Sequence, residues 1–326
     1  MNYLKCKVAV IGEGNMIPSV VCCLLRAGHQ VKSFTSRDPA GEVRRLAEIA
    51  GFSCLGNGEW EKNLEGHPEL ADCAIVVALT PEKMEEKAAM LRKIEKVANQ
   101  DTLIALNSES ITLDQLQDQM QLPSRLVGLN WTYPAHQTLF AEVIANQQTD
   151  TEMTENLMTL VRETWDKDPY LLKRGMGIRS RLMAAMAREA FFLVDQGYVE
   201  VADIDRACRN DPGYYLPFAG NCRYMDLMGT FIYGIVMEDL NPELSRAREI
   251  PDQFNSLMEI SLDQGRTSQG FYTHTVDENE KLELSFLEFS REMRSLMDRY
   301  PFPKGDYPEE VGVTAKQKNT SNNHKK

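Results

Sequence analysis

The apolar positions in the first part of the chain alternate between short continuous runs and helical spacing. Val8 to Ile11 is a four-residue apolar run with the length and β-branched content of a strand buried on both faces. Gly12-Glu13-Gly14 follows at once, and apolar residues then recur at a helical period from Met16 to Leu25. A second strand is predicted from Val31 to Thr35. This order of strand, glycine turn, helix and strand predicts the opening of a doubly wound nucleotide-binding domain.

The same alternation continues as far as residue 130. Strands separated by helices pair in parallel, so the pattern predicts an α/β protein with a Rossmann-type doubly wound sheet. Strands are predicted at 74–79, 102–107 and 125–130, and helices at 41–50, 82–98 and 112–120.

From Leu182 to Tyr300 the pattern is helical throughout, which predicts an all-helical C-terminal domain. Helices are expected at 182–194, from Asp203, and at 224–237, 251–262 and 282–297. The methionines of this region are interpreted as core filling rather than as a cofactor contact. The predicted division is a Rossmann domain at 1–174, a helical domain at 175–305 and a polar, low-complexity, disordered tail at 306–326.

The composition restricts the possible partners and the compartment. The 326 residues allow two domains with separate cores, and the net charge of −12 disfavours nucleic acid or an anionic membrane as a partner. Seven cysteines without paired spacing indicate reduced thiols. No signal peptide precedes Val8, no apolar run has the length of a membrane span, and no motif indicates a metal. We therefore expect a cytoplasmic protein.

The glycine turn has the chemistry needed for close approach to a pyrophosphate. Gly12 permits a tight turn, Gly14 lacks the Cβ that would block the phosphates, and the amides of Asn15 and Met16 present the positive end of the helix. The third glycine of the usual fingerprint is replaced by Ile17-Pro18. An ordinary βαβ unit is the alternative, and we predict a dinucleotide site.

The end of the second predicted strand bears on the choice of cofactor. A carboxylate here would accept hydrogen bonds from the adenosine ribose and repel a 2′-phosphate. Thr35-Ser36-Arg37 offers two hydroxyls and a guanidinium instead, which favours NADP over NAD. The alternative is a solvated turn that happens to contain an arginine. The prediction is NAD(P), with a preference for NADP.

A polar cluster, Asn107-Ser108-Glu109-Ser110, follows the strand at 102–107. Ligands of open α/β sheets gather at the carboxyl ends of the strands, so a nicotinamide or a substrate is expected here. The alternative is a helix N-cap before the predicted helix at 112–120.

The run from Gly128 to Ile144 resembles the 3-hydroxyacyl-CoA dehydrogenase family. Gly128-Leu129-Asn130-Trp131-Thr132-Tyr133-Pro134 matches the family's Gly-Leu-His-Phe-Phe-Asn-Pro, and Ala141-Glu142-Val143-Ile144 matches the strand that follows it. Further similarities occur in order over about residues 5 to 275, at 107–110, 177–182, 203–205, 226–229 and 266–272. The resemblance implies a homodimer formed through helical domains and a small-molecule substrate, acyl-CoA among the candidates, bound in the cleft between the domains.

The departures from the family pattern fall on its functional positions. Asn130 stands where the family has its catalytic histidine, and the glutamate that orients this histidine is retained as Glu142. Glu109 replaces a substrate-contacting serine, with Ser110 beside it, and Thr80 replaces a glutamate that helps to hold the nicotinamide. Lys87 is expected to keep the neighbouring cationic role, and Asn107 to lie at the cofactor.

An asparagine cannot accept the hydroxyl proton of an alcohol at neutral pH, so we expect reduction to be favoured over oxidation. Asn130, with its NH₂ oriented by Glu142, would polarise the carbonyl, and Tyr133 would donate the proton. The alternative for Tyr133 is packing beside Trp131 and Pro134, and we do not expect His136 to act as a base. The function expected is an NAD(P)-dependent oxidoreductase of this family type acting on a hydroxyacyl or keto/hydroxy-acid substrate. The alternatives are a nucleotide-binding protein without turnover and a scaffold with a vestigial site.

Overall fold

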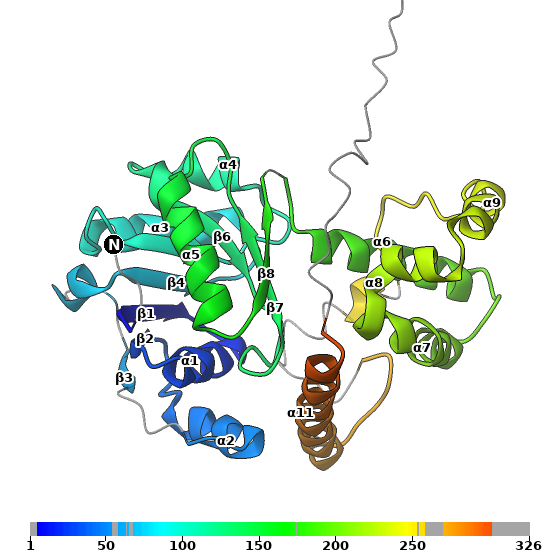
Figure 1. Cartoon of the computed structure of the whole chain (residues 1–326), viewed down its shortest axis with the longest axis horizontal. Helices are drawn as coiled ribbons and strands as arrows, with labels where there is room; N and C mark the ends of the chain where they lie inside the picture. The colour runs from blue at the N-terminus through cyan, green and yellow to red at the C-terminus, as the bar shows by residue number, and fades with distance from the viewer. Residues whose placement is uncertain are drawn as a thin grey trace, which may run out of the picture.

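The structure is a computed structural model and describes residues 5–53, 58–62, 64, 68–173, 175–252, 254–257 and 270–301. An eight-stranded sheet occupies the first half of the chain, in the order β3-β2-β1-β4-β5-β6-β7-β8 (Figure 1). Neighbouring strands are parallel except β6 and β7, which are antiparallel. The strands are β1 (Lys7–Gly12), β2 (Gln30–Phe34), β3 (Gly58–Glu61), β4 (Ile75–Leu79), β5 (Leu103–Leu106), β6 (Leu126–Asn130), β7 (Phe140–Ile144) and β8 (Asp168–Leu172).

Helices cover both faces of this sheet, which explains the continuous apolar runs of its central strands. Val8 and Val10 of β1 pack toward α1, α2 and α5, whereas Ala9 and Ile11 pack toward α3 and α4. The predicted Rossmann-type fold is therefore confirmed. The helices of this part are α1 (Met16–Arg26), α2 (Ala40–Ala50), α3 (Met84–Val97), α4 (Leu113–Gln117) and α5 (Thr151–Glu163), with the short 3₁₀ helices η1 (Pro68–Asp72) and η2 (Pro123–Arg125).

Two strands and one α-helix of the sheet domain were not predicted. Strands β3 and β8 lie at the two edges of the sheet, and much of each is solvent-exposed, so neither has a continuous apolar run. The start of helix α5 could have been predicted, because Asp150 is an N-cap residue. Its side chain accepts a hydrogen bond from the Met153 amide at 2.8 Å.

The second half of the chain is helical, as predicted. Strand β8 ends at Leu172 and α6 begins at Ile178, on either side of the boundary expected after residue 174. The single helix expected at 224–237 is wrong, because Gly229, at φ 108°, separates two helices there. The predicted helix at 251–262, the family match at 266–272 and the tail lie partly or wholly outside the described residues. The helices are α6 (Ile178–Asp195), α7 (Val201–Asn210), α8 (Pro212–Met228), α9 (Thr230–Leu240) and α11 (Val276–Arg299).

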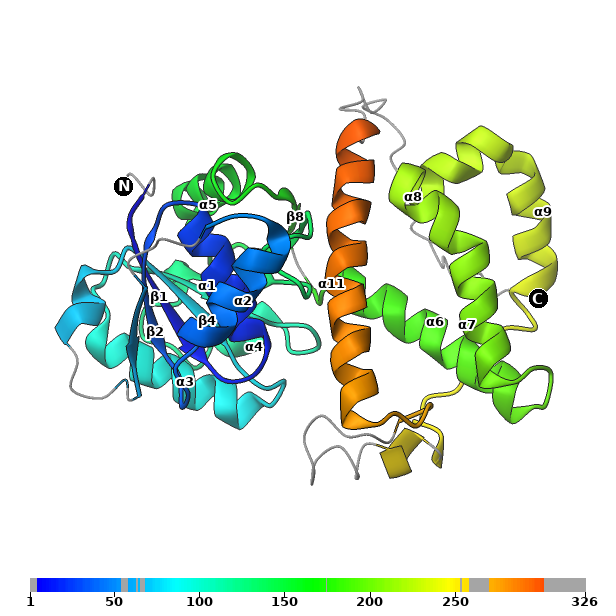
Figure 2. The same cartoon turned by 90° about the horizontal axis from the view of Figure 1, so that it is seen from below.

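Helix α11 lies between the sheet domain and the group α6 to α9 in both views (Figures 1 and 2). Its Leu287 is fully buried in the core of the sheet domain. Arg294 donates to the Asp166 carboxylate at 2.9 Å, and Arg291 donates to the carbonyl of Ile49 at 3.2 Å. The last described helix is therefore packed on the sheet domain.

The helices of the second half bury few of their apolar side chains. Within the described residues, α6, α7 and α9 have no buried side chain, and α8 has only Ala219. No helix in the described part of the chain is long and apolar enough to cross a membrane.

Candidate active site

The glycine turn lies at the carboxyl edge of the sheet, where β1 leads into α1. A Cβ at Gly12 would overlap the carbonyl oxygen of Leu79 at the end of β4, so only glycine allows these strands to come this close. Gly14 has φ +94°, and no protein atom lies within 4 Å of the position of its absent Cβ. This open space beside the first turn of α1, at Asn15 and Met16, fits the approach of a pyrophosphate. Ile17, in place of the third glycine, is buried in the core.

The predicted ribose site contains a carboxylate that sequence reasoning missed. Oε2 of Glu13 accepts hydrogen bonds from the hydroxyls of Thr35 at 3.2 Å and Ser36 at 2.5 Å, and Oε1 accepts the Ser36 amide at 2.8 Å. Thr35 is buried, whereas Arg37 is exposed. The hydroxyls expected to face a ligand are thus turned toward Glu13.

Asn107 joins the ends of β4 and β5. Its Oδ1 accepts the Thr80 amide at 2.8 Å, and its Nδ2 donates to the Thr80 carbonyl at 2.9 Å. Lys87 lies behind this pair, with Nζ 2.6 Å from the carbonyl of Asn107 and 3.0 Å from Oε2 of Glu82. Burial lowers the pKa of Lys87, and the ion pair with Glu82 opposes this shift. Because Lys87 is fully buried, it supports this edge from behind rather than facing the cleft.

Glu82 is a second residue of this edge that sequence reasoning missed. Its Oε1 accepts three consecutive backbone amides, from Glu109 at 3.0 Å, Ser110 at 2.7 Å and Ile111 at 3.0 Å. Burial raises the pKa of Glu82, but the Ser110 amide and Lys87 outweigh this effect, so the pKa lies below its ordinary value. One carboxylate therefore shapes the turn after β5. Its position three residues after the end of β4 was a readable signal.

Asn130 and Glu142 lie next to each other on the antiparallel pair β6 and β7, and both are buried. The expected hydrogen bond from Nδ2 of Asn130 to Oε1 of Glu142 is present at 2.9 Å. The second N–H of Asn130 donates to the carbonyl of Ser108 at 2.8 Å, and its Oδ1 accepts the Ser108 amide at 2.7 Å. Both donors of the Asn130 side chain are therefore used within the protein.

Glu142 also connects the sheet to the helical part of the chain. Its Oε2 accepts hydrogen bonds from the Tyr170 hydroxyl at 2.8 Å and the Ile178 amide at 2.7 Å, so the carboxylate caps the N-terminus of α6. A Cβ at Gly177 would overlap Oε1 of Glu142. Burial, with the hydrogen bond to Glu142, raises the pKa of Tyr170.

An ion pair stands beside this junction. Both carboxylate oxygens of Glu109 lie 3.2 Å from Nη1 of Arg179, and the Ser180 hydroxyl donates to the same carboxylate. The Glu109 and Arg179 side chains are 38% and 29% exposed, so a ligand can reach them. The residue that replaces the family's serine is thus paired with a guanidinium from the start of α6.

Tyr133 points toward α11. Its hydroxyl donates to Oε1 of Glu283 at 2.8 Å, and its ring stacks on Phe286. Burial, then the hydrogen bond to Glu283, raises the pKa of Tyr133. The Tyr133 hydroxyl is thus bonded to α11 and not to Asn130 or Glu142. Tyr133 also lines a cavity of about 540 Å³ between α1, α2 and α11. The other lining residues are Asn15, Pro18, Glu42, Arg45, Glu280, Glu283 and Leu284.

His136 is 2% exposed, and its Nδ1 lies 3.0 Å from the Ser19 hydroxyl on α1. Burial lowers the pKa of His136 to about 4, with Lys167 and Arg26 contributing in the same direction. His136 therefore belongs to the packing of α1.

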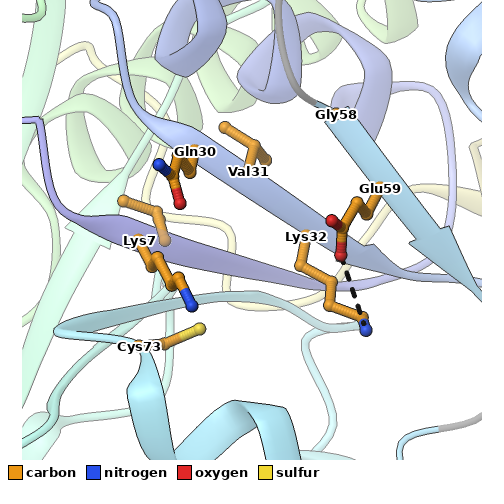
Figure 3. A pocket seen from close by; sticks show the side chains of 8 residues that line it. Lys7, Gln30, Val31, Lys32, Gly58, Glu59 and Cys73 are labelled. Atoms are coloured by element: carbon orange, nitrogen blue, oxygen red, sulfur yellow. Dashed lines mark ion pairs between the residues drawn. The ribbon is translucent and has the colours of Figure 1, made fainter.

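Another cavity, of about 590 Å³, lies at the opposite edge of the sheet (Figure 3). Lys7, Gln30 and Gly58, the first residues of β1, β2 and β3, line it. Lys32 projects into it and pairs with Glu59 at 3.8 Å. Because nucleotides bind at the carboxyl ends of parallel strands, this cavity is not the expected nucleotide site.

The fold and the glycine turn define a class: a Rossmann-type dehydrogenase fold followed by a helical domain. Family models place the chain within this class. The 3-hydroxyacyl-CoA dehydrogenase NAD binding domain matches residues 56–174, and the C-terminal domain of the same family matches residues 178–274. The chain belongs to the 3-hydroxyacyl-CoA dehydrogenase family.

Two individual relatives are distant in sequence but are matched over most of their length. The 5-formyl-3-hydroxy-2-methylpyridine 4-carboxylate 5-dehydrogenase of Mesorhizobium japonicum is 25% identical over 85% of this chain and 93% of its own. The 3-hydroxybutyryl-CoA dehydrogenase of Clostridioides difficile is 22% identical over 82% of this chain and 99% of its own. A crystal structure of a 5-formyl-3-hydroxy-2-methylpyridine 4-carboxylic acid 5-dehydrogenase, an NAD⁺-dependent dismutase, shares the fold with a TM-score of 0.79 at 24% identity, over 90% of this chain and 98% of that one.

Proposed function

We propose that this protein is an NAD(P)-dependent oxidoreductase that acts on a small hydroxy or keto acid and works better as a reductase. The observation that carries this proposal is the open glycine turn at the same sheet edge as the polar groups that follow β4, β5 and β6. Membership of a dehydrogenase family supports it. A bound nicotinamide would supply or accept a hydride.

The residues of this chain divide the binding task between two sets. Gly12, Gly14, Asn15 and Met16 would hold the pyrophosphate at the start of α1. Asn107, braced by Thr80 and by Lys87 behind it, would shape the nicotinamide end of the site.

The position of Arg179 favours a substrate that carries a carboxylate over a substrate that is recognised only through CoA. A guanidinium binds a carboxylate through parallel N–H bonds, and Arg179 is already held beside a carboxylate, that of Glu109. It is partly exposed and stands at the start of α6, next to the Glu142 cap. A substrate carboxylate would compete with Glu109 for Arg179. The Mesorhizobium relative, named for a pyridine carboxylate, agrees with this choice.

The direction of reaction follows from the replacement of the histidine. Asn130 cannot take up the proton that oxidation of an alcohol releases. Since both of its donors are used by Ser108 and Glu142, its role becomes positioning of the turn after β5. Tyr133 keeps its proton at neutral pH and stays the candidate donor, after release from Glu283. If it is the donor, Tyr133→Phe slows reduction while nucleotide affinity is unchanged, and an unchanged reduction rate removes the phenol from the mechanism.

The fully bonded Asn130 also favours a second candidate, a nucleotide-binding protein without turnover. A scaffold with a vestigial site would bind no nucleotide. Titrating the protein with NADH and NADPH while following nucleotide fluorescence separates this scaffold from the other two. Turnover of either nucleotide against a panel of 2- and 3-keto acids then separates the reductase from the binding protein.

Arg179→Gln tests the substrate class within the same assay. We expect KM for an active keto acid to rise at least about tenfold, because a charged hydrogen-bonding pair is lost. Arg188→Gln, an exposed position further along α6, is the matched control and should leave KM unchanged. Equal KM values for a keto acid and its methyl ester in the wild type would contradict carboxylate recognition.

We also propose that the helical domain pairs with a second copy of the chain. Phe231, Ile232 and Ile235 on α9 are 79%, 62% and 47% exposed, and apolar surface of this kind is normally covered.

A further inference from the structure

The carboxylate of Glu13 occupies the place where this fold usually meets the adenosine ribose. Ile11 of β1 pairs with Phe34 of β2, so the residues that follow the two strands emerge side by side. Glu13 follows β1, and Thr35 and Ser36 follow β2. The three hydrogen bonds that Glu13 accepts from these two residues fix its carboxylate against the end of β2.

These hydrogen bonds leave Oε1 of Glu13 able to accept one more hydrogen bond, and they use the donors of the Thr35 and Ser36 hydroxyls. The Thr35 and Ser36 hydroxyls both donate to Oε2 of Glu13, so they do not face a phosphate. Oε1 accepts one described hydrogen bond, from the Ser36 amide, and a carboxylate oxygen can accept two. This oxygen can accept a hydrogen bond from a ribose hydroxyl. A 2′-phosphate would be repelled there, because it carries the same charge as the carboxylate.

We propose that Glu13 is a specificity-determining residue that selects NAD(H) over NADP(H). In this fold a carboxylate at the end of β2 usually accepts a hydrogen bond from the ribose hydroxyl. Glu13 would accept the same hydrogen bond from its position in the glycine turn. The inference rests on the proposed function, because it requires a dinucleotide in this site. It reverses the NADP preference expected from Arg37. Both side chains are exposed, but the Arg37 guanidinium has no hydrogen-bond partner among the described residues, whereas three hydrogen bonds hold the Glu13 carboxylate in place.

Binding rather than activity tests this assignment. Dissociation constants for NADH and NADPH are measured by fluorescence titration of the wild type, Glu13→Gln and Arg37→Ala. We expect the wild type to bind NADH at least about tenfold tighter than NADPH. Glu13→Gln should reduce this ratio severalfold, mainly through tighter NADPH binding. Arg37→Ala, the control at the same turn, should leave NADH preferred.

A second measurement needs no variant, so it does not depend on the folding of Glu13→Gln. Displacement of bound NADH by 5′-AMP and by adenosine 2′,5′-bisphosphate compares ligands that differ only in the 2′-phosphate. Weaker displacement by the bisphosphate, with a difference that shrinks as salt is raised, supports the inference.

Three results would overturn the assignment. Tighter binding of NADPH than NADH by the wild type, an unchanged ratio in a folded Glu13→Gln, or stronger displacement by the bisphosphate each overturns the role of Glu13 while the proposed function stands. Binding of neither nucleotide overturns the proposed function as well.

Discussion

Single carboxylates organise this site by binding backbone amides of other elements. Glu82 accepts three amides of the turn after β5, Glu142 caps α6, and Glu13 holds the Ser36 amide after β2. An ionised carboxylate makes shorter and stronger bonds to N–H groups than a neutral acceptor does. The polar edge of the sheet is therefore held by residues far away in the sequence, and Asn130 belongs to the same network through its hydrogen bond to Glu142.

The two glycines of the turn should respond differently to the same substitution. Gly12→Ala places a Cβ against the Leu79 carbonyl, so we expect a loss of about 3 kcal/mol or more in the free energy of unfolding. A Cβ at position 14 has open space, so Gly14→Ala brings only the backbone strain of φ +94°. We expect this strain to lower the free energy of unfolding by about 1 kcal/mol. The loss in Gly14→Ala should appear instead as weaker NADH binding. Urea unfolding and NADH titration measure the two effects, and normal NADH affinity in Gly14→Ala would contradict the pyrophosphate site.

His136 should make stability fall in mild acid. Burial lowers the pKa of His136 from its ordinary value of 6.5 to about 4 in the folded state, so the unfolded chain binds the proton first as the pH falls. Stability from this residue is complete above about pH 6.5 and is lost as the pH falls toward 4. Between pH 7 and pH 5 the loss is about 2 kcal/mol.

Urea unfolding across this pH range measures the effect, with His136→Leu as the comparison. The variant should show a smaller pH slope and a kcat near that of the wild type. An unchanged slope would contradict the assignment of this acid sensitivity to His136, and a large loss of kcat in a folded variant would make His136 a catalytic base.

At the scale of elements, the junction between β7 and α6 sets the position of the helical domain next to the sheet. Glu142 binds the first amide of α6, and Gly177 is the residue without a Cβ that lets the chain pass directly over this carboxylate. The ion pair of Glu109 and Arg179 lies one residue further on and is partly solvated. The first contact is buried and structural, and the second is free to exchange partners.

This difference predicts unequal effects of two matched substitutions. In Glu142→Gln, one carboxylate oxygen becomes an NH₂ group, which then faces another hydrogen-bond donor. That donor is Asn130 if Oε1 is replaced, or Tyr170 and Ile178 if Oε2 is replaced. We expect a loss of about 2 kcal/mol in the free energy of unfolding. Glu109→Gln should cost less than about 1 kcal/mol, because its pair is partly exposed. Thermal unfolding of both variants provides the comparison. Similar losses in the two would show that the junction is not held by Glu142.

At the scale of the whole molecule, the sheet domain has a complete core and the helices after Gly177 do not. Strands β1 and β4 are buried on both faces, whereas α9 presents large apolar side chains to solvent. Helix α11 lies between the two parts (Figure 2). It packs on the sheet domain through Leu287 and Arg294. A second copy of the chain is the proposed cover for the exposed helices.

Light scattering tests this proposed dimer. We expect the wild type to have twice the mass of one chain, and Phe231→Glu on α9 to shift it toward a monomer because a charge would be buried in the interface. Leu122→Glu, at an exposed apolar position of the sheet domain, is the control and should leave the mass unchanged. A monomeric wild type would contradict the proposal.

The sequence by itself determined most of the sheet and the glycine turn at its edge. Apolar runs such as Val8 to Ile11 identify strands buried on both faces, because local pattern and burial agree there. Five of the strands, four of the helices beside them and the glycine turn were predicted on this basis. The family match added the strand at 141–144 and the order of the later motifs. Edge strands β3 and β8 were missed because they lack a full apolar run. The start of α9 was merged with the end of α8 because apolar residues continue on both sides of Gly229, where the backbone ends one helix and begins another.

Only the tertiary structure decided which polar groups are used within the protein and which face a ligand. Glu13 reaches Ser36 across 23 positions of sequence, and Glu109 reaches Arg179 across 70. Asn130 was named from its place in a motif, but its two N–H groups are committed to Ser108 and Glu142. Hydrogen bonds between side chains and distant backbone depend on strand order and on where α6 begins. The periodicity of apolar residues carries no information about either, so these partners became visible only in the folded chain.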